Sequence, residues 1–476
     1  MNTHRYIARI ILEAETPIFV GSGEGSLLKD ALVQKDFNGL PIMHGTSLIG
    51  VLRHSIEDNL DVLSSEHSIW NNIFGFQKGD QGQGSRLRIS SAFLMINENE
   101  VAEDMNTPID EKIKAKFDNL PTRQHVRIDH KGVAINGGLF DNEVVFKGTR
   151  FKFEIELIGN EGDKVIWDEI LAKFQSPLFR IGQGTRNGYG NLKVFQLKSR
   201  IFDLKEDTDF IAYSEFDMSL NNDTTLSANA LSESANHGLI KYTLDLKPDS
   251  DFFIFSEGYG DQDVDNKPLE EEIVIYVNDK IYFEKQTVIP ASSIKGALAH
   301  RTAFHYNKLK KRWADELNTK DKKALECQIK MWTGNFNEAV DQLFGSEVGQ
   351  EKNQAHRGNV IINDVYISDD AINNNNIFNH VAIDRFTGGA MDGALFSEKV
   401  SQLKTDRGIL LEIFVDTIDN SLELHAFENA LLDITKGFLP LGGMTTKGMG
   451  IFTGKLAKND SKEINSYYLN DIEHAQ

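Results

Sequence analysis

The chain has 476 residues, of which 40% are hydrophobic and 26% are charged, and its formal net charge is −20. This length exceeds what one ordinary core organises, so a soluble protein of at least two domains is expected. The single cysteine, Cys327, excludes a disulfide framework and a cysteine-rich zinc site and indicates a reducing cytoplasm. No apolar run is long enough to span a membrane. The acidic balance argues against a protein that coats nucleic acid over its whole surface, but it leaves room for a local basic groove.

The first half of the sequence alternates elements typical of a mixed α+β domain. A half-buried strand, "RYIARIILEAETP", is followed by a glycine-containing extended segment and by a helix over 45–60. Thr46 and Ser47 are candidate N-caps of this helix. A strand is expected within 143–159 and a second helix over 165–176. A glycine-rich loop, "IGQGTRNGYG" at 181–190, then precedes the strand-like run "NLKVFQL".

The second half repeats this order after a polar stretch. Residues 202–237 have no sustained period and are predicted to link two domains. A hairpin with an Asn-Asp turn is expected within 271–289, and a helix over 291–313 has Ser292 and Ser293 as candidate N-caps. The Asn-rich region 350–380 is expected to be an insertion. A strand, a helix and a second glycine-rich loop, "LGGMTTKGMG" at 441–450, complete the pattern.

Five sequence blocks recur in the same order at a nearly constant offset. "LPIMHGTSLIGVLRHS" is matched by "TVIPASSIKGALAHRT", "NNIFG" by "DQLFG", and "HVRIDHKGVAINGGLF" by "HVAIDRFTGGAMDGALF". His125 and Phe140 thereby correspond to His380 and Phe396. Such an ordered series indicates a tandem duplication, with domains at 1–201 and 238–476 joined by the linker. Antiparallel strands and two helices in each repeat favour a ferredoxin-like (RRM-like) α+β domain.

The glycine-rich loops allow three interpretations. A dinucleotide fingerprint is disfavoured, because here a helix precedes the loop and a strand follows it. The glycines could serve only to make tight turns between helix and strand. Alternatively, a backbone free of side chains lets a phosphate chain approach the N–H donors, with Arg186 or Lys447 pairing a phosphate.

Taken together, these motifs resemble the RAMP superfamily of CRISPR proteins. The segment "DALVQKDFNGLPIMHGTSLIG" is similar to the signature of its Cas-seven backbone subunits in type III effector complexes. The likeness extends over nearly the whole chain, once in each repeat, so the chain looks like a fused double subunit. The resemblance implies a cytoplasmic antiviral endoribonuclease that holds CRISPR guide RNA and cleaves complementary single-stranded target RNA with a divalent metal, Mg²⁺.

The resemblance also implies partners: neighbouring backbone subunits, a small subunit and the large polymerase-like subunit, with no membrane. Two alternatives stay open. The chain could be a scaffold that binds guide RNA without cutting, or a superfamily endoribonuclease that processes precursor guide RNA. The latter usually depends on a histidine, and neither His44 nor His54 stands out as a candidate.

The catalytic aspartate implied by the resemblance is Asp30, six residues before Asp36. A loop carboxylate could act as general base toward a 2′-OH or could bind the divalent ion, although a solvated loop charge is the plainer interpretation. The second repeat departs from this pattern, since the position six residues before Asp279 is Ile273. Asp36, Asp265 and Glu272 are further catalytic or metal candidates, Asp263 lies nearby, and no metal ligand is firmly assigned.

The RNA-binding candidates lie at the helix starts, in the glycine-rich loops and near the paired histidines. They are Ser47, Arg53, Arg127, Gly182, Gly184, Arg186, Gly188, Ser293, Lys295, Arg385, Gly442, Gly443, Lys447 and Gly448. Arg127 and Arg385 flank Asp129 and Asp384, and could pair with them or with a phosphate. In the family, the segment that follows forms a hairpin that wedges between bases. The apolar candidates for the wedge are Val133, Ile135, Phe386 and Met391, for which core packing is the alternative.

Overall fold

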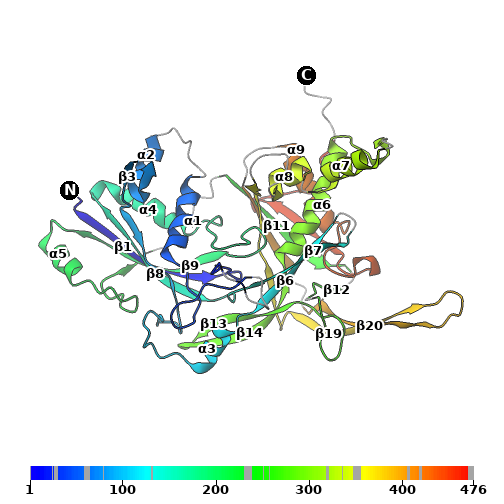
Figure 1. Ribbon diagram of the computed structural model, residues 1–476, viewed down its shortest axis with the longest axis horizontal. Coiled ribbons are helices and arrows are strands. Elements are labelled where there is room, and N and C mark those ends of the chain that lie inside the picture. Colours follow the sequence, from blue (N-terminus) through cyan, green and yellow to red (C-terminus); the bar gives the residue numbers. More distant parts are fainter. Residues whose placement is uncertain are drawn as a thin grey trace, which may run out of the picture.

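The computed structural model describes residues 2–23, 25, 31–57, 65–78, 80–129, 132–229, 238–249, 251–256, 258–317, 321–334, 336–346, 355–404, 408–416 and 421–469. Figure 1 shows one body formed mainly by the first half of the chain and another formed mainly by the second half. Both combine antiparallel sheets with helices, which confirms the predicted α+β class. No helix in these ranges is long and apolar enough to cross a membrane.

The first sheet has the strand order β10–β9–β1–β8–β4, with β5 paired to β8. Its strands are β1 (His4–Ala14), β4 (Leu87–Ile89), β5 (Phe93–Leu94), β8 (Arg150–Gly159), β9 (Leu192–Asp203) and β10 (Ser227–Ala228). Alternate side chains of β1, such as Tyr6 and Ile10, point to one face and are buried. There they pack with apolar residues of α1 (Gly45–Glu57) and α4 (Lys164–Lys173), as the strand period of two predicts.

The second sheet repeats this order. It runs β17–β21–β11–β22–β23, so β22–β11–β21–β17 matches β9–β1–β8–β4 strand for strand. Its strands are β11 (Leu239–Pro248), β17 (Val360–Ile362), β21 (Ile409–Asp416), β22 (Phe452–Lys458) and β23 (Lys462–Glu463). α6 (Ala291–Leu309) and α9 (Leu422–Thr435) take the places of α1 and α4. Two ferredoxin-like units in tandem are therefore confirmed.

The remaining elements decorate these two units. Around the first are the helices α2 (Ser65–Phe74), α3 (Glu111–Asp118) and α5 (Asp207–Ser214), and the short strands β2 (Phe76–Lys78) and β3 (Gln81–Gln83). Around the second are α7 (Lys322–Thr333), α8 (Glu338–Phe344), β15 (Gly345–Ser346) and β16 (His356–Arg357). α8 ends in the Phe344-Gly345 pair, which corresponds to Phe74-Gly75 at the end of α2.

A hairpin from the second half completes the core of the first. β13 (Glu270–Val277) and β14 (Lys280–Ile289) pair through the predicted Asn-Asp turn, in which both residues take positive φ. Val274, Tyr276 and Ile281 of this hairpin belong to the buried cluster of the first unit. Val274 N also donates a hydrogen bond of 2.8 Å to Lys147 O. The second half of the chain thus supplies part of the core of the first unit, so the two units are not independent of each other.

The predicted N-caps of the first helices are wrong. α1 begins at Gly45 and α6 at Ala291, so the serines lie inside the first turn. In each helix, the N–H of the first residue instead donates to a side chain of a neighbouring segment. Gly45 N donates to Ser91 Oγ at 3.4 Å, and Ala291 N donates to Asp364 Oδ1 at 2.7 Å. The serines of the first turn are therefore not needed for capping.

The region 350–380 is not an insertion. Its described part supplies β17, β18 (Val365–Ser368) and the start of β19 (Ile372–Ile383), which correspond to β4, β5 and β6 of the first half. The asparagines that suggested a loop are bonded within the sheet region. Asn374 Nδ2 donates to Thr287 Oγ1 at 2.7 Å, and Asn376 Nδ2 donates to Gln402 Oε1 at 3.1 Å.

The segment predicted as a linker has defined structure from 202 to 229. It forms α5 and β10, and it covers the outer face of the first sheet. Arg9 on this face is 1% exposed; its guanidinium lies over the Phe216 ring, and its Nε donates to Glu154. Asp223 accepts hydrogen bonds from Lys152 at 2.8 Å and Lys198 at 3.0 Å. Acidic side chains of the segment thus neutralise a cationic sheet face.

Each unit carries a two-stranded arm. The first arm is β6 (Thr122–Ile128) with β7 (Ala134–Glu143), and the second is β19 with β20 (Ala390–Leu403). β12 (Phe252–Phe253) pairs with the base of the second arm. In Figure 1 the first arm is directed toward the second unit, whereas the second arm extends away from the body at the lower right.

Candidate nucleic-acid interface

The two glycine-rich loops share one backbone conformation. Gly182, Gly190, Gly442 and Gly450 all have positive φ. A Cβ would lie 2.1 Å from Phe19 O at Gly182 and 2.4 Å from Ile254 O at Gly442. These glycines therefore let the chain pass close to its own backbone, as in the tight-turn interpretation. Gly184 corresponds in conformation to Met444, with φ of 56°, and not to Gly443.

The first loop (residues 181–190) is covered by the second unit. Arg186 is 8% exposed, and its Nε donates to Gly358 O at 2.8 Å. A Cβ at Gly188 would lie 2.4 Å from Asp364 Oδ1. Lys295 Nζ donates to Asn187 Oδ1 at 3.0 Å from the first turns of α6. This placement disagrees with the predicted RNA contacts of Arg186 and Gly188, because both residues serve the seam between the units.

The second loop (residues 441–450) is open. A Cβ at Gly448 would meet nothing within 4 Å, and the Lys447 side chain is exposed. Lys447 Nζ lies 4.4 Å from the centroid of the Phe396 ring, a cation–π distance. Lys447, Gly448 and the N–H groups around them can therefore reach a phosphate in the way that was predicted for both loops.

The first turns of α1 and α6 also carry polar groups, and Lys295 of α6 lies beside the first loop. Ser293 is exposed in the first turn of α6, and Ser47 is half-buried in α1. Burial, followed by the neighbouring Arg186, lowers the pKa of Lys295 to about 8, so its ammonium stays charged at neutral pH. Arg53 on α1 is half-buried and its Nη1 lies 3.5 Å from Gly75 O. A helix N-terminus with a lysine beside it favours anions.

The arms expose apolar side chains that a soluble protein normally buries. Val133 and Ile135 are 59% and 44% exposed, and Phe386 and Met391 are 100% and 52% exposed. Core packing, the alternative interpretation of these four residues, is therefore excluded. The tip turns are held by aspartates: Asp129 Oδ1 accepts from Val133 N, and Asp384 Oδ1 accepts from Phe386 N. Arg127 and Arg385 beside them are exposed on the same arms.

The histidines lie at matching places on the two arms. His125 is paired across the strands with Phe140, and His380 with Phe396. The rings stack with centroids 5.0 Å and 4.8 Å apart and with interplanar angles of 20° and 22°. Burial, together with Arg123, lowers the pKa of His125 to about 4, so the ring is neutral near pH 7. These stacks favour a structural role over metal ligation.

Sequence reasoning missed the ion cluster that joins the units. Arg123, at the root of the first arm, is buried, and its Nη1 lies 2.6 Å from Asp364 Oδ2. Its Nε and Nη2 each lie 2.6 Å from an oxygen of Glu271, which also accepts from Tyr366 Oη at 2.7 Å. Such a bidentate arrangement, with Arg123 and Asp364 buried and Glu271 half-buried, fixes the arm against the second unit. The partners are 148 and 241 residues away in sequence, beyond any local pattern.

The candidate catalytic carboxylates have different surroundings. Asp30 lies outside the described residues. Asp36 Oδ1 accepts hydrogen bonds from Asn38 N and Leu40 N, which makes it a turn residue, and burial raises its pKa. Asp265 Oδ2 accepts from Ser397 N at 2.8 Å, and Glu272 lies 2.6 Å from Lys116 Nζ.

These carboxylates do not fit a magnesium site. Asp265 and Glu272 are each engaged with a different partner, and no group of three or more metal-ligating side chains occurs in the ranges described above. The described residues therefore hold no assembled site for the implied metal, although Asp36 Oδ2 is buried without a hydrogen-bond partner.

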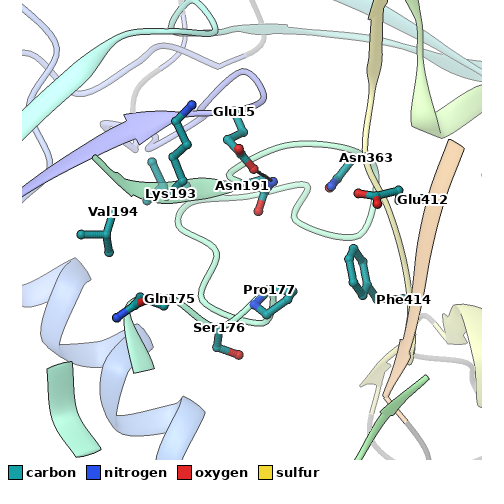
Figure 2. Close-up of a pocket in the computed structure, with 11 residues that line it drawn as sticks. Glu15, Gln175, Ser176, Pro177, Asn191, Lys193, Val194, Asn363, Glu412 and Phe414 are labelled. Atoms are coloured by element: carbon teal, nitrogen blue, oxygen red, sulfur yellow. Dashed lines mark hydrogen bonds between the residues drawn. The ribbon is translucent and has the colours of Figure 1, made fainter. Parts of the chain in front are cut away.

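A cleft lies between the two units. Figure 2 shows Glu15, Asn191 and Lys193 on one side and Asn363 and Glu412 on the other. Its volume is about 270 Å³. Its charged lining side chains are the carboxylates of Glu15 and Glu412 and the ammonium of Lys193, so the cleft has no excess of positive charge for a phosphate chain. The exposed arms and the second loop are the better nucleic-acid surface.

Comparison with known proteins agrees with this architecture. The family model of the RAMP superfamily matches residues 11–193 and 280–453, one region in each unit. A search of curated proteins returns no match. The matched regions include both arms, both glycine-rich loops and the helices α1, α4, α6 and α9, and together they span well over half of the sequence. The chain belongs to the RAMP superfamily.

Proposed function

We propose that this protein is a guide-RNA-binding backbone subunit of a type III CRISPR effector complex, acting in the cytoplasm in antiviral defence. The observation that carries the proposal is the repetition of an arm and a glycine-rich loop in two fused RAMP units. Two such units in one chain suit a long, repetitive ligand such as a single RNA strand. The large polymerase-like subunit, the small subunit and further backbone subunits are the proposed partners.

The proposed RNA surface combines positive charge with exposed apolar side chains. Lys447, Arg127 and Arg385 are exposed and supply cations at the second loop and on the arms, and Lys295 is half-buried at the start of α6 with its ammonium bonded to Asn187. Val133, Ile135, Phe386 and Met391 supply apolar groups that can insert between bases. This local surface accounts for RNA binding by a chain whose net charge is −20.

We further propose that the first unit cleaves target RNA through Asp30. A carboxylate beside a distorted RNA backbone can accept the proton of a 2′-OH, whose oxygen then attacks the adjacent phosphorus. The leaving 5′ oxygen takes a proton from solvent. In the second unit, Asp265 and Glu272 are engaged in structural contacts, which favours a unit that holds RNA without cutting it.

The test is cleavage of end-labelled target RNA by the complex assembled on a matching guide. Asp30→Ala is expected to leave assembly and target binding intact and to remove one band of the cleavage ladder, because the sequence predicts Asp30 in a loop, where a carboxylate contributes little to folding. Asp265→Ala and Glu272→Ala are the matched controls and should leave every band in place.

The same assay separates the two alternatives. A full ladder from Asp30→Ala would contradict the catalytic role and favour a scaffold, the second candidate function, which the engaged carboxylates of the second unit support. Cutting of precursor guide RNA by the chain alone, without metal, would instead indicate a processing endoribonuclease. If neither guide nor target RNA binds, the proposed function itself is wrong.

A further inference from the structure

Two asparagines on opposite walls of the cleft between the units have amide groups that are oriented by charged partners. Arg180 Nη2 donates to Asn363 Oδ1 at 2.5 Å, and because a guanidinium can only donate, the amide oxygen of Asn363 must face it. Asn191 Nδ2 donates to Glu15 Oε2 at 2.7 Å, and because a carboxylate can only accept, the amide nitrogen of Asn191 must face it. Each amide therefore presents its other polar atom elsewhere: Asn363 Nδ2 is a donor and Asn191 Oδ1 is an acceptor.

These two atoms are directed into the cleft. Figure 2 shows the Asn363 nitrogen and the Asn191 oxygen pointing toward the space between the two walls. Neither atom makes a hydrogen bond to any residue that the structure describes. The amide of Gln175, which also lines the cleft, makes no side-chain hydrogen bond within the same ranges. The cleft thus offers a fixed donor, a fixed acceptor and an amide that can supply either.

The charged side chains at the rim of the cleft are already paired. Lys193 Nζ lies 2.8 Å from Glu13 Oε1, and Glu412 Oε1 lies 2.8 Å from Lys241 Nζ. Figure 2 also shows Lys193 extending away from the space between the walls. A charged ligand would have to compete with these ion pairs for a partner, so a neutral ligand suits the cleft best.

Arg180 ties the two walls together. It is 4% exposed, and its Nε donates to Pro177 O at 3.1 Å, whereas its Nη1 is buried without a hydrogen-bond partner in the described chain. Burial, followed by the charge of Arg186, lowers the pKa of Arg180 to about 9, so the guanidinium stays charged at neutral pH. Arg180 forms no ion pair with a described residue, so no carboxylate there competes with Asn363 for its Nη2.

One side of the cleft is formed by rings. Phe414 on β21 is 8% exposed, and Figure 2 shows its ring and Pro177 bordering the space that the two amides face. Ring faces of this kind pack against planar ligands. The volume of about 270 Å³ is below the range of roughly 300–1,000 Å³ that holds drug-sized ligands, so there is room for one small ring system.

We propose that the cleft binds a nucleobase, which donates to Asn191 Oδ1, accepts from Asn363 Nδ2 and packs against Phe414. A nucleobase is planar and neutral, and its edge carries a donor and an acceptor side by side, as the two amides require. The base comes from a free nucleoside or from an unpaired position of a bound strand, and its chemistry is the same in both. Because the base contacts both walls, its binding also stabilises the seam. The inference does not depend on the RNA surface of the arms and the second loop.

Isothermal titration of the full chain with adenosine, guanosine, cytidine and uridine tests the proposal. At least one nucleoside should bind saturably and raise the melting temperature, since it binds only the folded chain. The decisive variant is Asn363→Asp. Its carboxylate still accepts from Arg180, so the melting temperature should be unchanged or higher, but the donor toward the cleft is lost and nucleoside affinity should fall at least about tenfold. Phe414→Leu, which keeps an apolar side chain without the ring, should weaken binding less.

Lys193→Met is the matched control. Lys193 lines the cleft but extends away from it, so the nucleoside affinity of this variant should equal that of the wild type. A nucleoside 5′-monophosphate should bind no more tightly than the nucleoside, because the one lining cation, Lys193, is paired with Glu13. Displacement of the nucleoside by a single-stranded RNA oligonucleotide would support the base site and assign the base to RNA. Persistence of the bound nucleoside would support the site and assign it to free nucleosides.

Three results would overturn the inference. They are no saturable binding of any nucleoside, an unchanged affinity in Asn363→Asp, and tighter binding of the monophosphate that Lys193→Met removes. Guide RNA affinity of the wild type, read by fluorescence anisotropy, tests the proposed function separately, so failure of the cleft and failure of the proposed function are distinguishable.

Discussion

The two glycine-rich loops have nearly the same sequence pattern and backbone, yet they have different surroundings. In the first, Gly188 faces Asp364 and Arg186 is buried against the second unit. In the second, Gly448 faces open space and Lys447 is exposed. The motif therefore fixes a chain conformation and does not by itself fix a role. What decides the role is whether another unit follows in the same chain.

The largest effect is expected from breaking the seam that covers the first loop. Arg123→Met leaves Asp364 and Glu271 buried without their cation, and should destabilise the chain by about 3–5 kcal/mol. The midpoint of urea unfolding measures this. The control is Lys164→Met, which breaks the exposed pair with Asp168 and should cost about 0.3–0.5 kcal/mol. Equal losses in the two variants would mean that the seam does not hold the units together.

A second prediction concerns the pH dependence of the free energy of unfolding, to which the histidine beside the first loop contributes. His125 contacts Tyr189 of the first loop, and its pKa of about 4 lies below the ordinary 6.5. The unfolded chain therefore binds a proton first as pH falls, and the stabilisation present above pH 6.5 is lost between 6.5 and 4. The loss at pH 4 should reach up to about 3 kcal/mol. His125→Gln should flatten this part of the stability curve, measured by urea unfolding at several pH values. An unchanged slope would show that His125 does not titrate there.

The smallest expected effect is a change in RNA affinity, and it compares the two glycine-rich loops directly. Lys447→Glu should weaken guide RNA binding about tenfold at low salt and reduce the salt slope by about 1, because one phosphate contact is lost. Arg186→Glu should instead lower the melting temperature, because it places a carboxylate in the seam. Fluorescence anisotropy at several salt concentrations measures the first, and thermal melting the second. If both variants changed only the salt slope, the first loop would also be an RNA contact.

The sequence predicted the repeated architecture because the duplication supplied an internal alignment. The matching blocks located both helix starts and both arms, and the Asn278-Asp279 turn followed from its own residues between two strand-like runs. Prediction from the sequence failed where a residue's hydrogen-bond or ion-pair partner is far away in the sequence. The carboxylate that accepts the hydrogen bond of Ala291 N belongs to Asp364, 73 residues away. The polar residue Asn374 suggested a loop, because its hydrogen-bond partner Thr287 is distant in the sequence. The ion cluster around Arg123 was invisible for the same reason.

The exchanged hairpin has a consequence for the order in which the protein forms. Val274, Tyr276 and Ile281 complete the core of the first unit, although they follow its last sheet strand by many residues. During synthesis, the first unit leaves the ribosome with this part of its core unfilled until β14 has emerged. Closure of so long a loop is slow in folding terms. The nascent first half is therefore exposed to chaperones and to mispairing for longer than an independent domain of its size, and a chain cut between the units would expose that apolar gap permanently.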